Sequence, residues 1–464
     1  MGFDATQSAP HEEDTTMTTQ DVDTRTLRRV IAAASIGNFV EWFDFAAYGF
    51  LATILTREFF PSGDPTIGLL KTFAVFAVAF AFRPLGGLIF GVIGDRIGRK
   101  RTLALTILMM AGSTTLIGLL PTYASIGYWA PLLLTIIRCV QGFSAGGEYA
   151  GACAYVMEHA PRRRRAFFGS FVPVSTFSSF ACAAVVAYLL ESSLSSQAMI
   201  EWGWRVPFLI AAPVGLIGVY LRVNLNETPA FQALEGKHDI AHAPLMETLH
   251  SQSRNILKLG AFVSVTALSF YTFTTYFATY LQVAGHLSRG TSLLVTVLAL
   301  LFAAALCPVA GLFSDLVGRR ATIATTGIFI IVSVYPAFSL GGSGVLSHSL
   351  LGVALLAIGA VFSGVVTAPL MSEVFATKTR YTASAITYNL AYTIFGGTAP
   401  LVATWLISAT GTNLSPAYYL IAVSIFAMIG GLSLPETSKT ALEEAGPATG
   451  RTAQSAKRGV ERAV

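Results

Sequence analysis

The feature that most constrains this chain is a series of long apolar segments separated by short polar loops. Each segment has about 20 residues or more, enough for an α-helix to cross a hydrocarbon layer about 30 Å thick. Only 12% of the 464 residues are charged, against roughly 25% in a soluble domain. The surplus apolar surface must face lipid. We therefore predict an all-α integral membrane protein.

The chain divides into two six-helix halves, residues 28–224 and 256–435, because the apolar segments stop in the polar stretch 225–255. We interpret this stretch as a cytoplasmic linker. Residues 1–27 are polar and lack the apolar core of a signal peptide, so we expect a disordered cytoplasmic tail there, and a second cytoplasmic tail at 436–464. The twelve predicted spans are 30–55, 69–94, 102–121, 129–157, 166–190, 205–224, 256–283, 291–313, 321–341, 348–374, 381–409 and 416–435.

The distribution of basic residues predicts the orientation of the spans, because Lys and Arg accumulate on cytoplasmic loops. When the loops are numbered alternately, one set carries little beyond Arg57 and Arg289. Both termini are therefore expected on the cytoplasmic side of the cell inner (plasma) membrane. The basic clusters adjoin spans, so no nucleic-acid partner is expected. The other set of loops carries Arg25, Arg28, Arg29, Arg96, Arg99, Lys100, Arg101, Arg162 to Arg165, Arg222, Lys237, Arg254, Lys258, Arg319, Arg320, Lys378 and Arg380.

A short loop sequence occurs once in each half. Residues 91–100 read Gly-Val-Ile-Gly-Asp-Arg-Ile-Gly-Arg-Lys, and residues 311–320 read Gly-Leu-Phe-Ser-Asp-Leu-Val-Gly-Arg-Arg. Glycine, aspartate, glycine and two basic residues thus recur at the same spacing, 220 residues apart from Gly91 to Gly311. Repeated halves with a site between them are suited to alternating access, in which one half rocks against the other.

The repeated loop is interpreted as a conformational latch. Its glycines allow a close approach of backbones, and an aspartate near a helix end can accept backbone N–H groups or pair with the neighbouring arginine. Topology marking by the basic residues alone remains an alternative. The predicted latch residues are Gly91, Asp95, Arg96, Gly98, Arg99, Gly311, Asp315, Gly318 and Arg319.

Together with Arg138 and Gln141-Gly142 in the fourth span, the loop at 91–100 resembles the signature of the major facilitator superfamily. Further motifs resemble its metabolite:proton symporter family. They lie at residues 37–45, 83–87, 141–149, 202–208 and 226–231. The resemblance implies the twelve-helix major facilitator fold and proton-coupled import of a small organic solute.

Within that family, three segments are most similar to proline/betaine transporters, namely residues 60–65, 216–222 and 416–420. The seventh span differs, because residues 269–276 resemble those of alpha-ketoglutarate carriers. The resemblance therefore implies proline or glycine betaine as the solute, with alpha-ketoglutarate or another carboxylate metabolite as the alternative.

Three acidic residues inside spans are candidates for proton coupling: Asp44, Glu41 and Glu148. Ionisable side chains at membrane depth are costly and usually mark a substrate or proton pathway. Glu41 and Asp44 are three residues apart on one helix, and two close carboxylates resist ionising together. A purely structural ion pair of Glu41 with Arg83 or Arg138 remains an alternative.

Arginines and aromatic residues in other spans are candidates for substrate binding. An arginine can pair with a carboxylate, and aromatic faces attract ammonium groups, so the combination suits a zwitterion such as betaine or proline. Helix packing or lipid contact is the alternative for each of them. The predicted substrate-binding residues are Arg83, Arg138, Tyr48, Tyr271, Tyr276, Tyr388 and Asn389.

Other classes of membrane protein fit the sequence less well. A channel could also use polar residues in a bundle, but the duplicated loop and the two halves favour a carrier. The spans contain no metalloprotease or nucleophile-elbow motif and no phosphate-binding loop, so neither catalytic residues nor ATP are expected. The four cysteines (Cys139, Cys153, Cys182 and Cys307) lie within apolar segments without metal-type spacing. We expect a monomer that uses the proton as its coupling ion, with no cofactor or metal.

Overall fold

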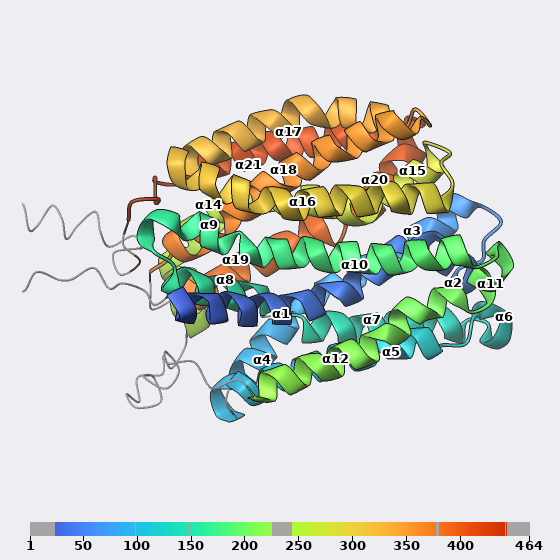
Figure 1. Ribbon diagram of the computed structural model, residues 1–464, viewed down its shortest axis with the longest axis horizontal. Helices are drawn as coiled ribbons and strands as arrows, with labels where there is room; N and C mark the ends of the chain where they lie inside the picture. Colours follow the sequence, from blue (N-terminus) through green and yellow to red (C-terminus); the bar gives the residue numbers. More distant parts are fainter. Residues whose placement is uncertain are drawn as a thin grey trace, which may run out of the picture.

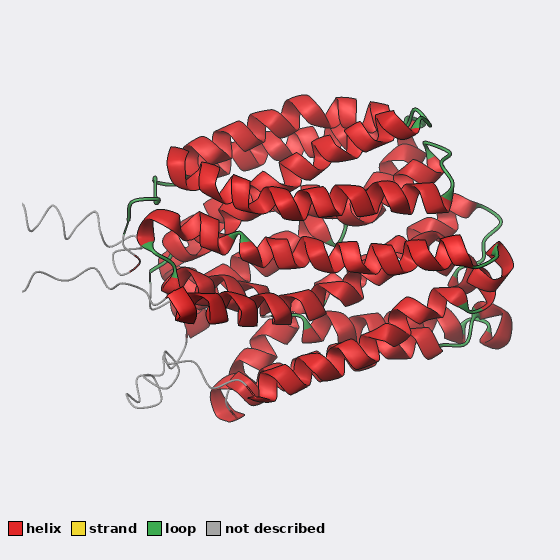
Figure 2. Ribbon diagram, in the orientation of Figure 1, coloured by secondary structure: helices red, strands yellow, loops and turns green. Residues whose placement is uncertain are grey.

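The computed structural model describes residues 24–97, 99–146, 148–224, 244–376, 380–440 and 442. Every regular element among these residues is a helix, as Figure 2 shows. The prediction of an all-α protein is therefore confirmed. Helices satisfy their backbone hydrogen bonds internally, which is what a segment surrounded by lipid requires.

The first half of the chain folds into long helices joined by short helical turns. Its elements are α1 (Thr24–Phe50), α2 (Ala52–Phe59), α3 (Pro65–Ala81), α4 (Arg83–Ile97), α5 (Arg99–Leu119), α6 (Tyr123–Ile126), α7 (Trp129–Ser144), α8 (Glu148–His159), η1 (Arg162–Arg164), α9 (Arg165–Gly169), α10 (Phe171–Ser193), α11 (Ser196–Glu201), η2 (Gly203–Arg205) and α12 (Val206–Asn224).

The second half contains two π-helical turns, η3 and η4, inside its longest helical stretches. Its elements are α14 (Pro244–Tyr271), η3 (Thr272–Tyr276), α15 (Phe277–Val283), α16 (Arg289–Val317), α17 (Arg319–Gly341), α18 (Leu346–Glu373), α19 (Arg380–Ala391), η4 (Tyr392–Gly396), α20 (Ala399–Thr410) and α21 (Ser415–Leu432).

The predicted spans correspond to helices of the structure. Within the described part of the chain, ten helical stretches are long and apolar enough to cross a membrane. The third predicted span is the shorter apolar helix Ala104–Leu119 within α5. The fourth corresponds to α7 and α8 together. The arrangement agrees with the twelve-helix major facilitator fold.

The fourth span is not one continuous helix, and the prediction was wrong on this point. The helix ends at Ser144 and restarts at Glu148. At Gly146, a Cβ atom would lie 2.3 Å from the carbonyl oxygen of Arg83 and 2.3 Å from the backbone nitrogen of Gly87. The start of α4 thus packs directly against this break, which is a tertiary contact that the apolar pattern of the span does not reveal.

Two predicted boundaries were also wrong. Helix α1 begins at Thr24, inside the predicted N-terminal tail, and α14 begins at Pro244, inside the predicted linker. Residues 24–27 and 244–255 therefore extend the first and seventh spans. The remainder of the linker and of the N-terminal tail lies outside the described residues.

The helices run side by side along the long axis of the molecule (Figure 1). Helices α5 and α12 pack together in the first half, and α17 packs on α18 and α21 in the second. The halves meet where α10 packs on α16, α3 on α20, α1 on η3, and α8 on α18 and α19. We call the end that holds Thr24 and the residues after Leu432 the terminal end, and the other the opposite end.

Local sequence signals fix several helix ends. At the opposite end, the Asp64 side chain accepts a hydrogen bond of 2.8 Å from the backbone N–H of Thr66 and caps α3. Ser288 caps α16 in the same way. Such caps contribute about 1 kcal/mol each. At the terminal end, Gly318 joins α16 to α17 with φ of +92°, a conformation that glycine adopts without strain.

Candidate functional site

The centre of the bundle holds a buried ion pair between the first and second spans. Nη2 of Arg83 donates to Oε1 of Glu41 over 2.7 Å, and the two side chains are 1% and 0% exposed. Arg83 is the first residue of α4, directly after the break that ends α3. Of the two partners predicted for Glu41, the structure pairs it with Arg83.

The guanidinium group of Arg83 is enclosed by aromatic rings. Its Cζ atom lies 5.5 Å from the ring centre of Trp42, 5.0 Å from that of Phe45 and 5.0 Å from that of Phe80. Nε and Nη1 of Arg83 are buried and have no hydrogen-bond partner. Buried donors are normally paired. These two nitrogens therefore carry N–H donors that the protein leaves unsatisfied.

A column of tyrosines from both halves lies next to this arginine. Tyr149 of α8 stacks on Tyr388 of α19 with ring centres 4.6 Å apart, and Tyr388 stacks on Tyr392 of η4 at 3.9 Å. The ring of Tyr271 lies 6.1 Å from that of Tyr392. The hydroxyl groups of Tyr271 and Tyr388 are buried and make no hydrogen bond of ordinary length. The hydroxyl of Tyr271 lies next to Arg83, and that of Tyr388 lies next to Tyr392.

Two π-helical turns shape this region. Turn η3 directly follows Tyr271, and η4 begins at Tyr392. Single π-helical turns within α-helices occur frequently at functional sites. Here they set the rotation of the seventh and eleventh spans at the level of the tyrosine column.

Arg138 belongs to a second buried cluster. It donates to Oε1 of Gln141, and Nε2 of Gln141 donates to Thr114 over 2.6 Å. The Cζ atom of Arg138 lies 4.2 Å from the ring centre of Tyr48, whose hydroxyl donates to the carbonyl oxygen of Thr72. The ring of Phe45 lies against both Arg138 and Arg83.

The remaining predicted substrate residues lie at contacts between the halves. Asn389 donates from Nδ2 to the carbonyl oxygen of Gly146 over 2.6 Å. The ring of Tyr276 lies 6.2 Å from that of Phe73 in α3. The structure thus brings Arg83, Tyr271 and Tyr388 together, whereas Tyr276 packs on Phe73 and Asn389 binds the backbone of Gly146.

Two of the predicted coupling residues have side chains outside the described part of the structure. Asp44 lies in α1, one turn after Glu41, and Glu148 is the first residue of α8. Their backbones thus flank the region that holds the ion pair and the tyrosine column.

The repeated loop of the second half connects the two halves at the terminal end. Asp315 accepts hydrogen bonds from the backbone N–H groups of Ala166 (3.0 Å) and Phe167 (2.9 Å) at the start of α9. A carboxylate is stabilised in this position by the partial positive charge of a helix N-terminus. A Cβ atom on Gly311 would lie 2.6 Å from the carbonyl oxygen of Ala166. Only a residue without a side chain allows this approach.

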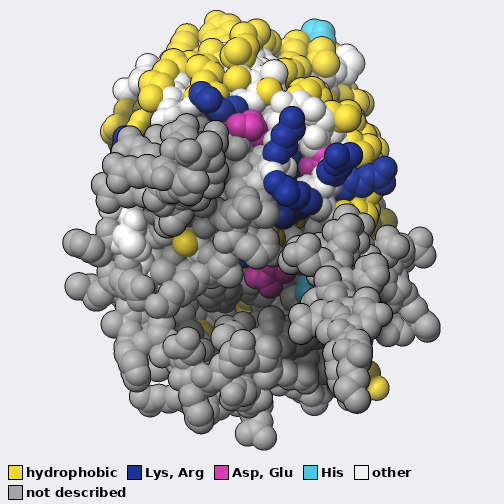
Figure 3. Space-filling model, turned by 90° about the vertical axis from the view of Figure 1, so that its left-hand side faces the viewer, with side chains coloured by type: hydrophobic (Ala, Val, Ile, Leu, Met, Phe, Trp, Pro, Cys, Tyr) yellow, Lys and Arg dark blue, Asp and Glu magenta, His cyan; other side chains and the backbone are white. Residues whose placement is uncertain are grey.

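A buried charge network surrounds that contact. Arg319 contacts Glu373 through two hydrogen bonds of 3.0 and 3.1 Å, and it contacts Asp315 at 3.0 Å. Arg165 of the first half lies 3.7 Å from Glu373. Figure 3 looks onto this end, where basic side chains surround acidic ones. Of the equivalent loop in the first half, Gly98, the surroundings of Gly91, and the side chains of Asp95, Arg96 and Arg99 lie outside the description.

The residues after α21 fold back onto the same network. Glu436 accepts hydrogen bonds from the backbone N–H groups of Arg319 and Arg320, each 2.9 Å long. Burial acts to raise the pKa of Glu436, but these hydrogen bonds and those from Ser438 outweigh it, so the pKa lies below its ordinary value. Thr437 donates to Glu373 over 2.7 Å. This part of the predicted C-terminal tail is therefore ordered against the bundle.

The family follows from comparison with known proteins. The pattern of the sugar (and other) transporter family matches residues 30–261 and 244–448. The proline/betaine transporters of Salmonella typhimurium and Escherichia coli K12 are each 39% identical to the chain over 437 residues, covering 92% of this chain and 87% of theirs. This chain belongs to the sugar (and other) transporter family. It is a membrane transporter and not an enzyme.

Further comparisons agree with this transporter's fold and family. The ectoine/proline transporter of Corynebacterium glutamicum is 37% identical over 443 residues, covering 92% of this chain and 88% of its own. The structure of the major facilitator superfamily proton:xylose symporter XylE has a TM-score of 0.69 with 16% identity, covering 90% of this chain and 98% of that one. At this level of identity the likeness concerns the fold alone.

Several residues of the transporter's centre were not predicted from the sequence. They are Trp42, Phe45, Phe80 and Tyr149. A signal existed for two of them, since Trp42 adjoins Glu41 and Tyr149 adjoins Glu148 in the family motifs. In addition, Nε1 of Trp42 donates to Asn38 over 2.9 Å, which fixes the indole ring in place.

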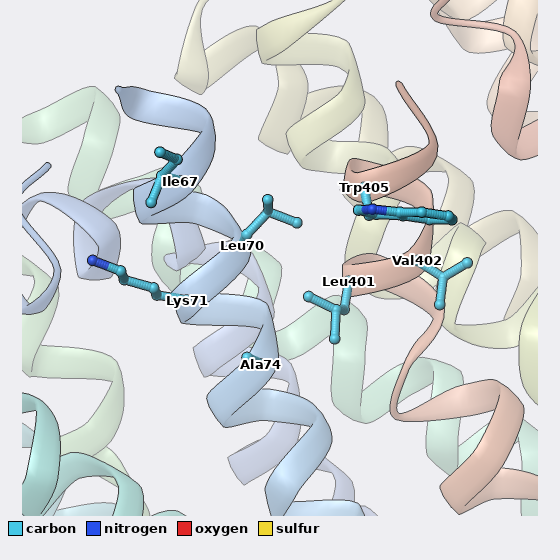
Figure 4. Close-up of a pocket in the computed structure, with 7 residues that line it drawn as sticks. All are labelled: Ile67, Leu70, Lys71, Ala74, Leu401, Val402 and Trp405. Carbon is cyan, nitrogen blue, oxygen red and sulfur yellow. The ribbon is translucent and has the colours of Figure 1, made fainter. Parts of the chain in front are cut away.

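A cleft of about 490 Å³ lies between the halves, but it is unsuited to a charged solute. It opens between α3 and α20, and Figure 4 shows the Lys71 side chain pointing away from α20. Its lining atoms are apolar. None of the predicted site residues contributes to it. The lining residues are Ile67, Leu70, Lys71, Ala74, Leu401, Val402 and Trp405.

Proposed function

We propose that this transporter imports a small zwitterionic solute, with proline and glycine betaine as the first candidates, together with protons. The relatives named as proline/betaine transporters support this choice. The observation that carries it is that two buried nitrogens of Arg83, Nε and Nη1, make no hydrogen bond and lie beside a column of tyrosines.

The two chemical poles of a zwitterion match the two sides of this centre. The free N–H groups of Arg83 are directed donors for a carboxylate, and arginine can bind a carboxylate through two parallel hydrogen bonds. Tyr388 is stacked between Tyr149 and Tyr392. The ring of Tyr271 and the outer face of Tyr392 are therefore left to attract a secondary or quaternary ammonium group, an interaction worth up to about 2 kcal/mol when it is desolvated. Because Arg83 belongs to the first half and these two tyrosines to the second, a bound solute would contact both halves.

Proton coupling is assigned to the acidic residues of the first and fourth spans. Glu41 is buried in contact with Arg83, so its protonation would remove one charge from the centre. Asp44 and Glu148 are assigned to the same step because of their positions in α1 and α8. The proton serves as the only coupling ion, and no cofactor or metal takes part.

Alternating access would use the terminal end as a latch. In the structure Asp315, Arg319 and Glu373 of the second half hold the start of α9, which belongs to the first. The basic residues of the loops at this end support its assignment to the cytoplasmic side of the inner membrane. The latch would then be closed while solute enters from outside, and the monomer would open it to release solute into the cell.

The experiment is uptake into proteoliposomes that contain the purified protein. Radiolabelled proline, glycine betaine and alpha-ketoglutarate are offered in sodium-free buffer under an inward proton gradient. We expect accumulation of proline or betaine that a protonophore abolishes. Uptake of alpha-ketoglutarate alone would contradict the zwitterion proposal, and uptake that needs sodium would contradict proton coupling.

A charge-removing pair of variants tests the binding centre. Arg83→Gln is expected to abolish uptake, because the centre loses its carboxylate donor. Arg57→Gln removes an equal charge from an exposed position in α2 and should leave uptake within about twofold of wild type, since surface substitutions have small effects. Equal uptake by both variants would contradict the role of Arg83.

A further inference from the structure

We propose that the carboxylate of Glu41 occupies part of the site of the substrate's carboxylate, so that the two groups compete for Arg83. Protonation of Glu41 would then be the event that releases the guanidinium group to the substrate. This inference rests on the proposed function and specifies how one arginine couples the proton to the solute.

The first argument is that the protein satisfies the hydrogen-bond donors of Arg83 on one side of the guanidinium group only. A guanidinium group has five N–H donors. Arg83 donates to Glu41 from Nη2, while Nε and Nη1 make no hydrogen bond. The group is 1% exposed, so it is shielded from bulk water. An under-satisfied buried arginine is suited to a second carboxylate, which would complete its hydrogen bonding through two parallel bonds.

The second argument is charge balance. Removing charges from water costs several kcal/mol per ion unless each is compensated. Arg83 can pair closely with one carboxylate, and a second one beside it would repel the first. With Glu41 ionised, a substrate carboxylate at Arg83 would lie next to another negative charge. With Glu41 protonated, that repulsion is absent. Proton and substrate binding therefore favour each other.

Among the described side chains, Glu41 is the group next to Arg83 that can change its charge; Asp44 and Glu148, which are assigned to the same step, have side chains outside the description. The groups packed around the ion pair are tyrosines of α8, α14, α19 and η4, with Arg138 of α7 behind Phe45. Tyrosine and arginine keep their charge state between pH 5 and 8. Of the described side chains around Arg83, Glu41 is the carboxylate in contact with it.

A structural ion pair makes the opposite prediction. If Glu41 merely oriented Arg83, neutralising Glu41 would weaken substrate binding, as neutralising Arg83 does. If Glu41 competes, its neutralisation removes the competitor. Neutralising Glu41 and neutralising Arg83 would then change substrate affinity in opposite directions. Glu41→Gln is the suitable substitution because it keeps nearly the same side-chain shape.

The experiment measures equilibrium binding of radiolabelled solute to purified full-length protein between pH 5.5 and 8.5. The solute is whichever of proline, glycine betaine or alpha-ketoglutarate the wild type binds, since all three carry a carboxylate. In the wild type, Kd should rise with pH, by up to about tenfold per unit for one proton. In Glu41→Gln, Kd should be independent of pH and no weaker than that of wild type at pH 5.5. Accumulation driven by a proton gradient should be lost.

Matched variants complete the test. Glu201→Gln removes an exposed carboxylate at the opposite end and should keep the wild-type pH profile. Arg83→Lys retains the charge without the planar fork and should bind at least tenfold more weakly at every pH. Thermal unfolding in detergent checks that each variant is folded.

The inference is overturned if folded Glu41→Gln keeps the wild-type pH dependence or loses binding. It also fails if wild-type binding does not depend on pH. These results differ from failure of the proposed function, which would appear in the wild type as binding of alpha-ketoglutarate alone. If the wild type binds none of the three solutes, both proposals are wrong.

Discussion

The two ends of the bundle hold the halves together by different means. At the terminal end, Arg319 and Glu373 are each 1% exposed, and the network reaches the first half through Arg165 and the start of α9. At the opposite end, the ion pair of Glu191 with Arg289 is 3.2 Å long, with side chains 15% and 26% exposed.

Uncharged contacts complete the opposite end. Thr53 and Gln282 share one hydrogen bond of 3.3 Å between the halves. Nearer the centre, a Cβ atom on Gly397 would lie 2.5 Å from Cβ of Phe80, so α3 and the eleventh span are in close backbone contact. The terminal end therefore depends on buried charges with specific geometry, and the opposite end on packing.

This difference in burial affects how much free energy each end loses when one of its ion pairs is removed. Removing one partner of a buried pair costs about 3–5 kcal/mol because a charge is left uncompensated. An exposed pair contributes about 0–1 kcal/mol. The terminal end should therefore open in an all-or-none manner, whereas the opposite end should loosen gradually.

The largest effect is expected for Glu373→Gln. The substitution leaves Arg165 without its buried counter-ion and Arg319 with Asp315 alone, which destabilises the closed terminal end by about 3–5 kcal/mol. Spin labels on R163C and A321C in a cysteine-free background should show a shift to longer distances. Glu158→Gln, which removes a partly exposed carboxylate 4.0 Å from Arg380, is the control, and an equal shift in both would contradict the comparison.

An intermediate effect is expected for Asp315→Asn. The variant loses the charge that the two backbone N–H groups of α9 stabilise, a loss of about 1.5–3 kcal/mol. The same pair of spin labels should report a smaller population of the open terminal end than Glu373→Gln does. A larger population would assign the main role to the helix cap instead of the buried pair.

A small effect is expected for Glu191→Gln. Its ion pair is partly exposed, so the change in the equilibrium should stay below about 1 kcal/mol and should decrease further at high salt. Labels on E201C and S343C measure the opposite end. A shift as large as that of Glu373→Gln at the terminal end would overturn the comparison.

The smallest effect is a pH dependence from Glu436. Because its pKa is lowered in the folded protein, it stabilises the terminal end above the unfolded value of 4.5, and this stabilisation is lost as pH falls through the lower folded value. The unfolding temperature in detergent should therefore fall less between pH 7 and pH 4 in Glu436→Gln than in wild type. Identical curves would show that Glu436 contributes nothing.

The sequence by itself determined the helices and the repeated loop. A run of apolar residues in lipid must form a helix because no water is present to satisfy its backbone, so the spans could be predicted locally. The recurrence of Gly311, Asp315 and Arg319 at the spacing of the first-half loop predicted a conformational latch, and the structure places this loop against the start of α9. The spacing of these residues was sufficient to predict the loop because they lie within about two turns of a helix end.

Only the tertiary structure decided which side chains meet. The sequence left Arg83 and Arg138 as equal partners for Glu41, and the structure pairs the one that is 42 residues away. It also uses the hydroxyl of Tyr48 for a backbone hydrogen bond and stacks Tyr149 on Tyr388 across the halves. These outcomes depend on how far each span rotates about its axis, which the break in the fourth span and the π-helical turns set. Such rotations arise from packing between distant segments, and an apolar pattern does not encode them.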